Sequence, residues 1–202
     1  MDTVVIFDTE FLVTEGAQAR FWCGPHDPDP VAVQIGAVKL GMGEGFPILN
    51  TLRIYICAKD RFGNDAVLDP FFSRLTGVTP ADIDAYGISL ADALEKLHQF
   101  TGDDRLWSWG KDELNMLAIS CYIEGIAPPL PIQRFGNICS LALKSGMSYE
   151  DIKKTRSSNL ADYLGAPHPA LKNHDALDDA LSVTYALRHL LSEGSLTPFD
   201  FH

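Results

Sequence analysis

The chain has 202 residues, of which 46% are hydrophobic, and this size and composition favour one domain with a substantial core over two domains. Its formal net charge of −11 argues against a protein that follows long phosphate chains, since such proteins normally present a basic face. It contains no long apolar run and no visible secretory leader, so we expect a cytoplasmic protein with no membrane partner. We expect one domain over residues 1–193 and a loose tail over residues 194–202.

The first predicted element is a strand at the start of the chain, over the apolar residues 3–7 (TVVIF). Side chains two residues apart in a strand point to the same face, so Asp8 and Glu10 converge where the strand ends. Two buried carboxylates side by side repel each other, and a bound cation relieves this repulsion. Their hard oxygen atoms favour Mg²⁺ or Mn²⁺ over Zn²⁺. A solvated acidic turn is the alternative for this short pattern.

Two more strands are predicted after a long connection. Residues 13–30 are rich in Pro, Gly and Asp, and we expect them to form a loop beside the carboxylates. The Gly-rich residues 41–45 (GMGEG) separate the second and third strands, which indicates an antiparallel meander. A helical stretch, a strand, a helix, a short strand and two more helices are predicted to follow, with the later strands added in parallel.

The middle of the chain offers a third carboxylate at the start of a helix. Residues 106–109 (LWSW) have the composition of a buried strand, and a helix is predicted over residues 112–124. Asp112 lies on an apolar helical stripe, whereas the stripe of Glu113 is mixed. The two stripes continue through Met116, Ile119 and Ile123 for the first, and through Leu117, Ser120 and Glu124 for the second. This favours Asp112 as the inward carboxylate, with Glu113 as the alternative.

The last predicted helix begins near residue 174 and extends through Glu193. Asp179 shares its stripe with Val183, Ala186 and Leu190, so it points toward the core. A carboxylate on an apolar stripe is unfavourable unless a charge or hydrogen bond compensates it, which makes Asp179 a candidate metal ligand. His174 precedes this helix and is a candidate proton acceptor near neutral pH.

Taken together, these segments resemble the DnaQ-like 3'-5' exonucleases, in particular the DEDDh branch of the DEDD superfamily. The resemblance covers most of the chain, in family order. It rests on residues 7–11 (FDTEF), 33–38 (VQIGAV), 75–79 (LTGVT), 108–112 (SWGKD) and 159–165 (NLADYLG), and on the His-x4-Asp spacing from His174 to Asp179. The second motif is similar to that of the enhanced-RNAi and histone-mRNA type, which places its aspartate three residues after the glycine. Glu113 fills that position here, and Asp112 fits only if the loop is one residue shorter.

The resemblance implies an α/β, ribonuclease-H-like fold, with a mixed five-stranded sheet and helices on both faces. It implies a metal-dependent 3'-5' exonuclease that uses two Mg²⁺ or Mn²⁺ ions on single-stranded RNA or DNA and releases nucleoside 5'-monophosphates. The implied metal ligands are Asp8, Glu10, Asp112 and Asp179, and the implied general base is His174.

The resemblance also implies contacts with the terminal nucleotide. Phe11 and Leu12 would stack against its base or sugar, and the turn Thr76–Gly77 would let the backbone approach it closely. Core packing for the first pair and an ordinary turn for the second are the alternatives. The acidic net charge favours a short single-stranded 3' end or short oligonucleotide as the partner, and residues 153–156 (KKTR) are the one basic cluster.

Two other functions stay open from the sequence. A catalytically silent nucleic-acid-binding module would keep the fold but lack a complete metal site, and the displaced second motif is the feature that supports it. A phosphodiesterase acting on small nucleotides would suit the acidity of the chain and the unassigned loop over residues 13–30.

Overall fold

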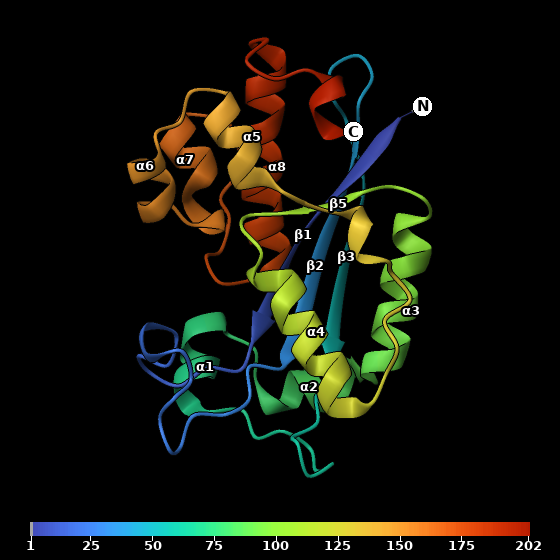
Figure 1. The fold of residues 1–202 in the computed structure, drawn as a ribbon, viewed down its shortest axis with the longest axis vertical. Coiled ribbons are helices and arrows are strands. Elements are labelled where there is room, and N and C mark those ends of the chain that lie inside the picture. Colours follow the sequence, from blue (N-terminus) through green and yellow to red (C-terminus); the bar gives the residue numbers. More distant parts are fainter. Residues whose placement is uncertain (1) are drawn as a thin grey trace.

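A computed structural model describes residues 2–202 of the chain. Its strands are β1 (Thr3–Phe11), β2 (Ala32–Gly41), β3 (Ile48–Ile56), β4 (Gly87–Ile88), β5 (Leu106–Ser108) and β6 (Phe135–Asn137). They form one mixed sheet in the order β4-β3-β2-β1-β5-β6 (Figure 1). The first three strands make the predicted antiparallel meander, and each later strand pairs in parallel with its neighbour.

The predicted count of five strands is wrong, because the sheet has six. The additional strand is β4, whose two residues pair with Tyr55 and Ile56 at one edge of the sheet. A strand of two residues is too short to show an alternating pattern of apolar and polar side chains. Its existence therefore depends on the neighbouring strand rather than on its own sequence.

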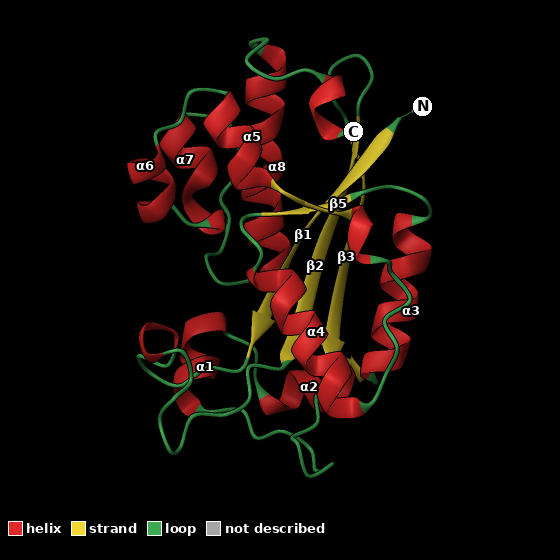
Figure 2. Cartoon of the chain, in the orientation of Figure 1, coloured by secondary structure: helices red, strands yellow, loops and turns green. Residues whose placement is uncertain are grey.

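Helices cover both faces of the sheet, as predicted (Figure 2). They are α1 (Pro70–Thr76), α2 (Pro80–Tyr86), α3 (Leu90–Thr101), α4 (Asp112–Glu124), α5 (Ile138–Lys144), α6 (Tyr149–Lys154), α7 (Leu160–Leu164) and α8 (Ala176–Ser192). Among residues 2–202, no helix is both long enough and apolar enough to cross a membrane.

The region after β6 holds four helices instead of the predicted two. Helix α5 ends in a turn at Gly146. Ser148 caps the following helix, α6, by accepting a hydrogen bond from the backbone N–H of Asp151. Helix α7 is followed by Gly165, which adopts a left-handed conformation with φ of +65°. Each of the first three helices in this region is therefore too short to give a clear helical period in the sequence.

Successive side chains of β1 point to opposite faces of the sheet, so they pack into two separate parts of the core. Val5 and Phe7 pack with α3 and α4, whereas Ile6 packs with α5 and α8. Since side chains alternate along a strand, Asp8 and Glu10 continue the face of Ile6, toward α8. The two carboxylates therefore begin where this apolar face ends.

Helix α8 lies in direct contact with the backbone of β2. A Cβ atom at Gly36 would lie 2.1 Å from the backbone nitrogen of Leu177, so only glycine permits this approach. The neighbouring Gln34 is fully buried, and its side-chain oxygen accepts a hydrogen bond from the N–H of Ala176 at 2.8 Å. The residues around Gly36 thus fix the position of the start of α8.

The C-terminal residues pack against the body of the protein instead of forming the loose tail that the sequence predicts. Leu196 and Phe201 are buried, and the ring of Phe201 meets that of Trp107 edge to face at 5.3 Å. Asp200, in the 3-10 helix Pro198–Phe201, pairs with Lys144 of α5. Leu196 and Phe201 are therefore part of the same core.

The substitution Phe201→Ala should lower the free energy of unfolding by about 3–5 kcal/mol, because it removes a buried ring and leaves a cavity. Phe199→Ala is the matched control, since Phe199 lies in the same 3-10 helix and is 85% exposed. The control should change stability by less than about 0.5 kcal/mol. Urea unfolding measures both variants, and equal stabilities would contradict the packing of this segment.

Gly36→Ala should destabilise the protein by about 3 kcal/mol or more, since the new methyl group would overlap the backbone of α8. Gly41→Ala in the same strand is the control, because the nearest atom to a Cβ there is a side-chain carbon of Pro47 at 3.3 Å. Thermal unfolding of the two variants compares them directly. A Gly36→Ala protein as stable as Gly41→Ala would show that α8 does not need this close approach.

Candidate active site

The end of β1 holds two buried carboxylates on one face. Asp8 is 6% exposed and Glu10 is 8% exposed, and they pair across the sheet with Gly36 and Gln34 of β2. The register shifts after Glu10, where Phe11 pairs with Ala32. The strand therefore delivers both carboxylates to the point where regular pairing stops and the loop over residues 13–30 begins.

The start of α8 brings a third carboxylate and an imidazole to the same place. Asp179 is 4% exposed and accepts a hydrogen bond from the backbone N–H of His174. His174 adopts a left-handed backbone conformation with φ of +59°, which is uncommon for a residue with a side chain. Asp175 caps the helix by accepting hydrogen bonds from the N–H groups of Leu177 and Asp178.

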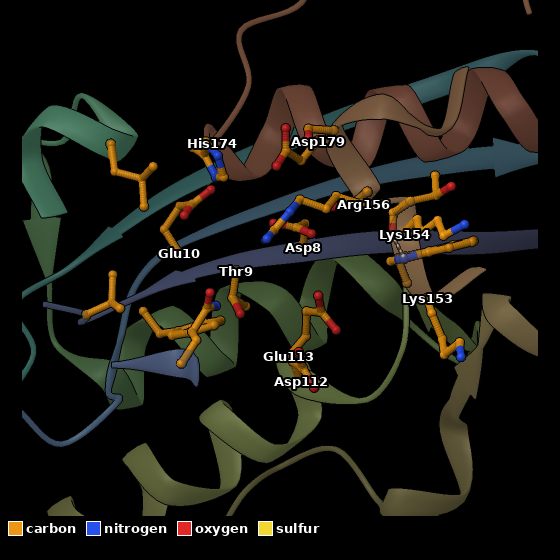
Figure 3. A pocket seen from close by; sticks show the side chains of 18 residues that line it. Asp8, Thr9, Glu10, Asp112, Glu113, Lys153, Lys154, Arg156, His174 and Asp179 are labelled. Atoms are coloured by element: carbon orange, nitrogen blue, oxygen red, sulfur yellow. Dashed lines mark hydrogen bonds between the residues drawn. The ribbon is translucent and has the colours of Figure 1, made fainter. Parts of the chain in front are cut away.

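The fourth buried carboxylate belongs to Glu113, and the prediction that Asp112 points inward is wrong. Glu113 is 6% exposed and lies near Asp8, whereas Asp112 is exposed at the start of α4 (Figure 3). The inward acid therefore lies three residues after Gly110, which is the alternative that the sequence left open.

The helical stripes favour the wrong acid because the hydroxyl group of Ser120 is buried. Ser120 lies on the stripe of Glu113 and gives that stripe a mixed composition, yet it is only 1% exposed. Its oxygen accepts a hydrogen bond from the N–H of Ala32 at 2.9 Å and donates one to the carbonyl of Met116 at 2.7 Å. With both bonds satisfied, the serine packs as readily as an apolar residue, so the stripe of Glu113 faces the sheet.

These side chains surround one cavity of about 360 Å³ (Figure 3). Its walls come from β1, α1, α4, the end of α6, α8, the loop over residues 13–30 and the segment between α6 and α7. The residues that line it are Asp8, Thr9, Glu10, Phe11, Val13, Gln18, Leu75, Trp109, Asp112, Glu113, Lys153, Lys154, Thr155, Arg156, Ser157, Ser158, His174 and Asp179. Val13 and Gln18 place the long loop beside the carboxylates, as the sequence predicts.

Burial raises the pKa of all four inward carboxyl groups, and the negative charges of their neighbours raise it further. The pKa rises to about 7 for Glu113 and to about 7 for Asp179. The pKa values of Asp8 and Glu10 also lie well above their ordinary values, first through burial and then through repulsion from the other acids. The folded protein therefore binds protons more tightly than the unfolded chain, and without a cation its stability falls as the pH rises from about 4 toward 7.

The pKa of His174 moves in the opposite direction. Burial, and next the positive charge of Arg156, lower the pKa of this imidazole below its ordinary value. The ring is therefore neutral at pH 7 and has a nitrogen free to accept a proton.

The donor set fits a divalent cation. Ligand atoms of Glu10, His174 and Asp179 all lie within 4.8 Å of one another. Within residues 2–202, the buried Oε2 atom of Glu113 has no hydrogen-bond partner. An unsatisfied buried carboxylate oxygen is costly unless a cation or proton compensates it. The carboxylate oxygens suit a hard divalent cation such as Mg²⁺ or Mn²⁺, and the imidazole of His174 lies beside them.

The residues predicted to contact substrate fall into two groups. Phe11 lines the cavity, whereas Leu12 is 2% exposed and packs in the core. Thr76 and Gly77 lie outside the cavity lining. The carbonyl of Thr76 accepts a hydrogen bond from Nζ of Lys172 at 2.8 Å, and Lys172 fills the space where a Cβ at Gly77 would lie. In this structure the glycine accommodates a lysine, which explains the turn without a ligand.

No family model matches the chain, and no curated protein matches it. Solved structures do match it. The nuclease domain of 3'hExo, a DEDDh family member bound to rAMP, is 20% identical with a TM-score of 0.75, over 96% of this chain and 94% of that one. A 3'-exonuclease with a histone mRNA stem-loop is 18% identical with a TM-score of 0.75, over 96% and 83% of the two chains. Cell-death related nuclease 4 (CRN-4) is 16% identical with a TM-score of 0.72, over 96% and 65%. This chain therefore has the fold of a DEDDh-family nuclease domain, as the motifs in its sequence imply.

Proposed function

We propose that this protein is a metal-dependent 3'-5' exonuclease that hydrolyses phosphodiester bonds at the 3' ends of single-stranded nucleic acid and releases nucleoside 5'-monophosphates. One observation carries the proposal: four buried carboxylates and a neutral imidazole meet in a single cavity, although they come from three distant parts of the chain. The shared fold supports it, because a matching nuclease domain is bound to rAMP.

The carboxylates and the imidazole of the cavity have different roles in the proposed reaction. Asp8, Glu10, Glu113 and Asp179 would hold two Mg²⁺ or Mn²⁺ ions, and Asp112 lies too far toward solvent for this role. Bound divalent ions supply charge compensation and lower the pKa of water at the reacting phosphate. His174 accepts the proton of the attacking water, since its ring is neutral at pH 7 and lies beside Glu10 and Asp179.

The cavity suits a terminal nucleotide. Its volume of about 360 Å³ is in the range of small-ligand sites. Phe11, Val13 and Leu75 contribute apolar surface, and an aromatic face can stack on any base. We therefore expect little sequence preference at the 3' end.

The test uses 5'-labelled and 3'-labelled single-stranded RNA and DNA, each incubated with Mg²⁺, with Mn²⁺ or with chelator. We expect a ladder that shortens from the 3' end and depends on metal, and Asp8→Asn and His174→Ala should abolish it. Release of label from the 5' end, or intact oligonucleotide in every condition, would contradict the proposal. Intact oligonucleotide with hydrolysis of a small nucleotide diester would favour a small-nucleotide phosphodiesterase instead.

Glu113→Gln should lower kcat/KM by about a hundredfold or more, because it removes a charged ligand while keeping the size of the side chain. Asp112→Asn, one residue earlier, is the matched control and should have little effect, since Asp112 is exposed. The two variants are compared by initial rates on the same 3' end. A larger loss in Asp112→Asn would mean that Asp112, rather than Glu113, is the ligand.

A further inference from the structure

A short basic segment lies beside the carboxylates. Residues 153–156 (KKTR) hold three of the 16 lysines and arginines, and all three basic side chains are exposed where they line the cavity. Figure 3 shows Lys153 and Lys154 on one side of Asp8, with His174 on the other side. A protein with a net charge of −11 thus places its one basic cluster at this cavity.

The backbone of the segment is held in place. The indole nitrogen of Trp109 donates a hydrogen bond to the carbonyl of Thr155 at 3.2 Å. The N–H of Thr155 donates in turn to the carbonyl of Asp151 at 2.9 Å. Ser158, which follows the segment, is 7% exposed. The basic side chains therefore extend from a fixed support, which suits a binding surface.

Two of the three positive charges are available to an external anion. Lys153 pairs with Glu150 at 2.7 Å, but within residues 2–202 neither Lys154 nor Arg156 forms an ion pair. Other arginines of the chain do pair, for example Arg53 with Asp175 at 2.6 Å. Unpaired cations that line a cavity attract anionic ligands.

The cavity has a polarity that matches a nucleic-acid end. Phe11 follows Glu10 at the end of β1, and with Leu75 of α1 it forms an apolar end. Figure 1 shows α1 well separated from α6, which carries Lys153 and Lys154. The order across the cavity is therefore apolar side chains, carboxylates, and then the two lysines, with Arg156 drawn next to Asp8 (Figure 3).

We propose that Lys154 and Arg156 bind the phosphates of the nucleic-acid chain on the 5' side of the bond that is cut. This inference rests on the proposed exonuclease function and names its substrate class. The terminal nucleoside lies at the apolar end, the reacting phosphate at the carboxylates, and the next phosphates along the basic segment. The substrate is then an oligonucleotide with at least two or three phosphates rather than a dinucleotide or a small diester.

The experiment compares single strands of two, three, four and six nucleotides that share the same 3'-terminal nucleotide. For the wild-type protein, we expect kcat/KM to rise about tenfold for each phosphate that is added beyond the dinucleotide, and then to level off. In the double variant Lys154→Ala/Arg156→Ala, the ratio of kcat/KM between the tetranucleotide and the dinucleotide should fall to less than about three. The conservative Lys154→Arg/Arg156→Lys variant should keep most of this ratio.

Salt dependence gives a readout that a merely structural role would not change. Each phosphate of a single strand that a basic side chain neutralises adds about −0.7 to the slope of log affinity against log salt. The double variant should therefore lose about 1.4 from the slope of log kcat/KM measured with the tetranucleotide. Lys96→Ala is the control, because Lys96 is exposed on α3, away from the cavity, and should change neither the ratio nor the slope.

The outcomes separate the two proposals. Hydrolysis of every length with the same kcat/KM, or a double variant that keeps the ratio and slope of the wild type, would overturn the basic segment's role and leave the exonuclease intact. No hydrolysis of any length by the wild-type protein would overturn both. A circular dichroism melting curve checks that the double variant is folded, and the conservative variant tests the role of charge if it is not.

Discussion

Crowded negative charge at the end of β1 is the constraint on which this structure depends. Asp8, Glu10, Glu113 and Asp179 are all buried, and within residues 2–202 none of them forms an ion pair. Such an arrangement destabilises a folded protein near neutral pH, since burial and mutual repulsion disfavour the charged forms. Cations bound to this cluster would offset the repulsion, which explains why the carboxylates are buried together.

Asp175 shows how the same protein treats an acid that is structural. It is buried beside the cluster, but it caps α8 and pairs with Arg53 of β3 at 2.6 Å. Together with the contact at Gly36, this pair ties α8 to the sheet. The fold thus uses paired polar groups to hold α8 in place, whereas the four acids that face the cavity form no ion pair within residues 2–202. We therefore interpret Asp175 as a structural residue that positions α8, and the acids that face the cavity as candidate metal ligands.

Much of the fold and site could be predicted from the sequence, because strong periodic patterns report burial. Strand alternation identified Asp8 and Glu10, and the helical stripe of α8 identified Asp179. The stripe argument ranked Asp112 above Glu113, its stated alternative, because a polar residue on the stripe of Glu113 is buried with its hydrogen bonds satisfied, which composition does not reveal. The two-residue strand β4 and the packing of Phe201 depend on distant partners, so no local pattern indicates them.

If the carboxylate cluster binds cations, stabilisation of the fold by metal should depend on pH. The measurement is the midpoint of thermal unfolding at pH 5.5 and pH 7.5, in chelator and with Mn²⁺. Because folding raises the pKa values of the cluster, we expect the metal-free protein to be less stable at pH 7.5 than at pH 5.5. Mn²⁺ should remove this deficit, with a larger stabilisation at pH 7.5. Equal stability at both pH values in chelator, with no gain from Mn²⁺, would show that the cluster is not a cation site.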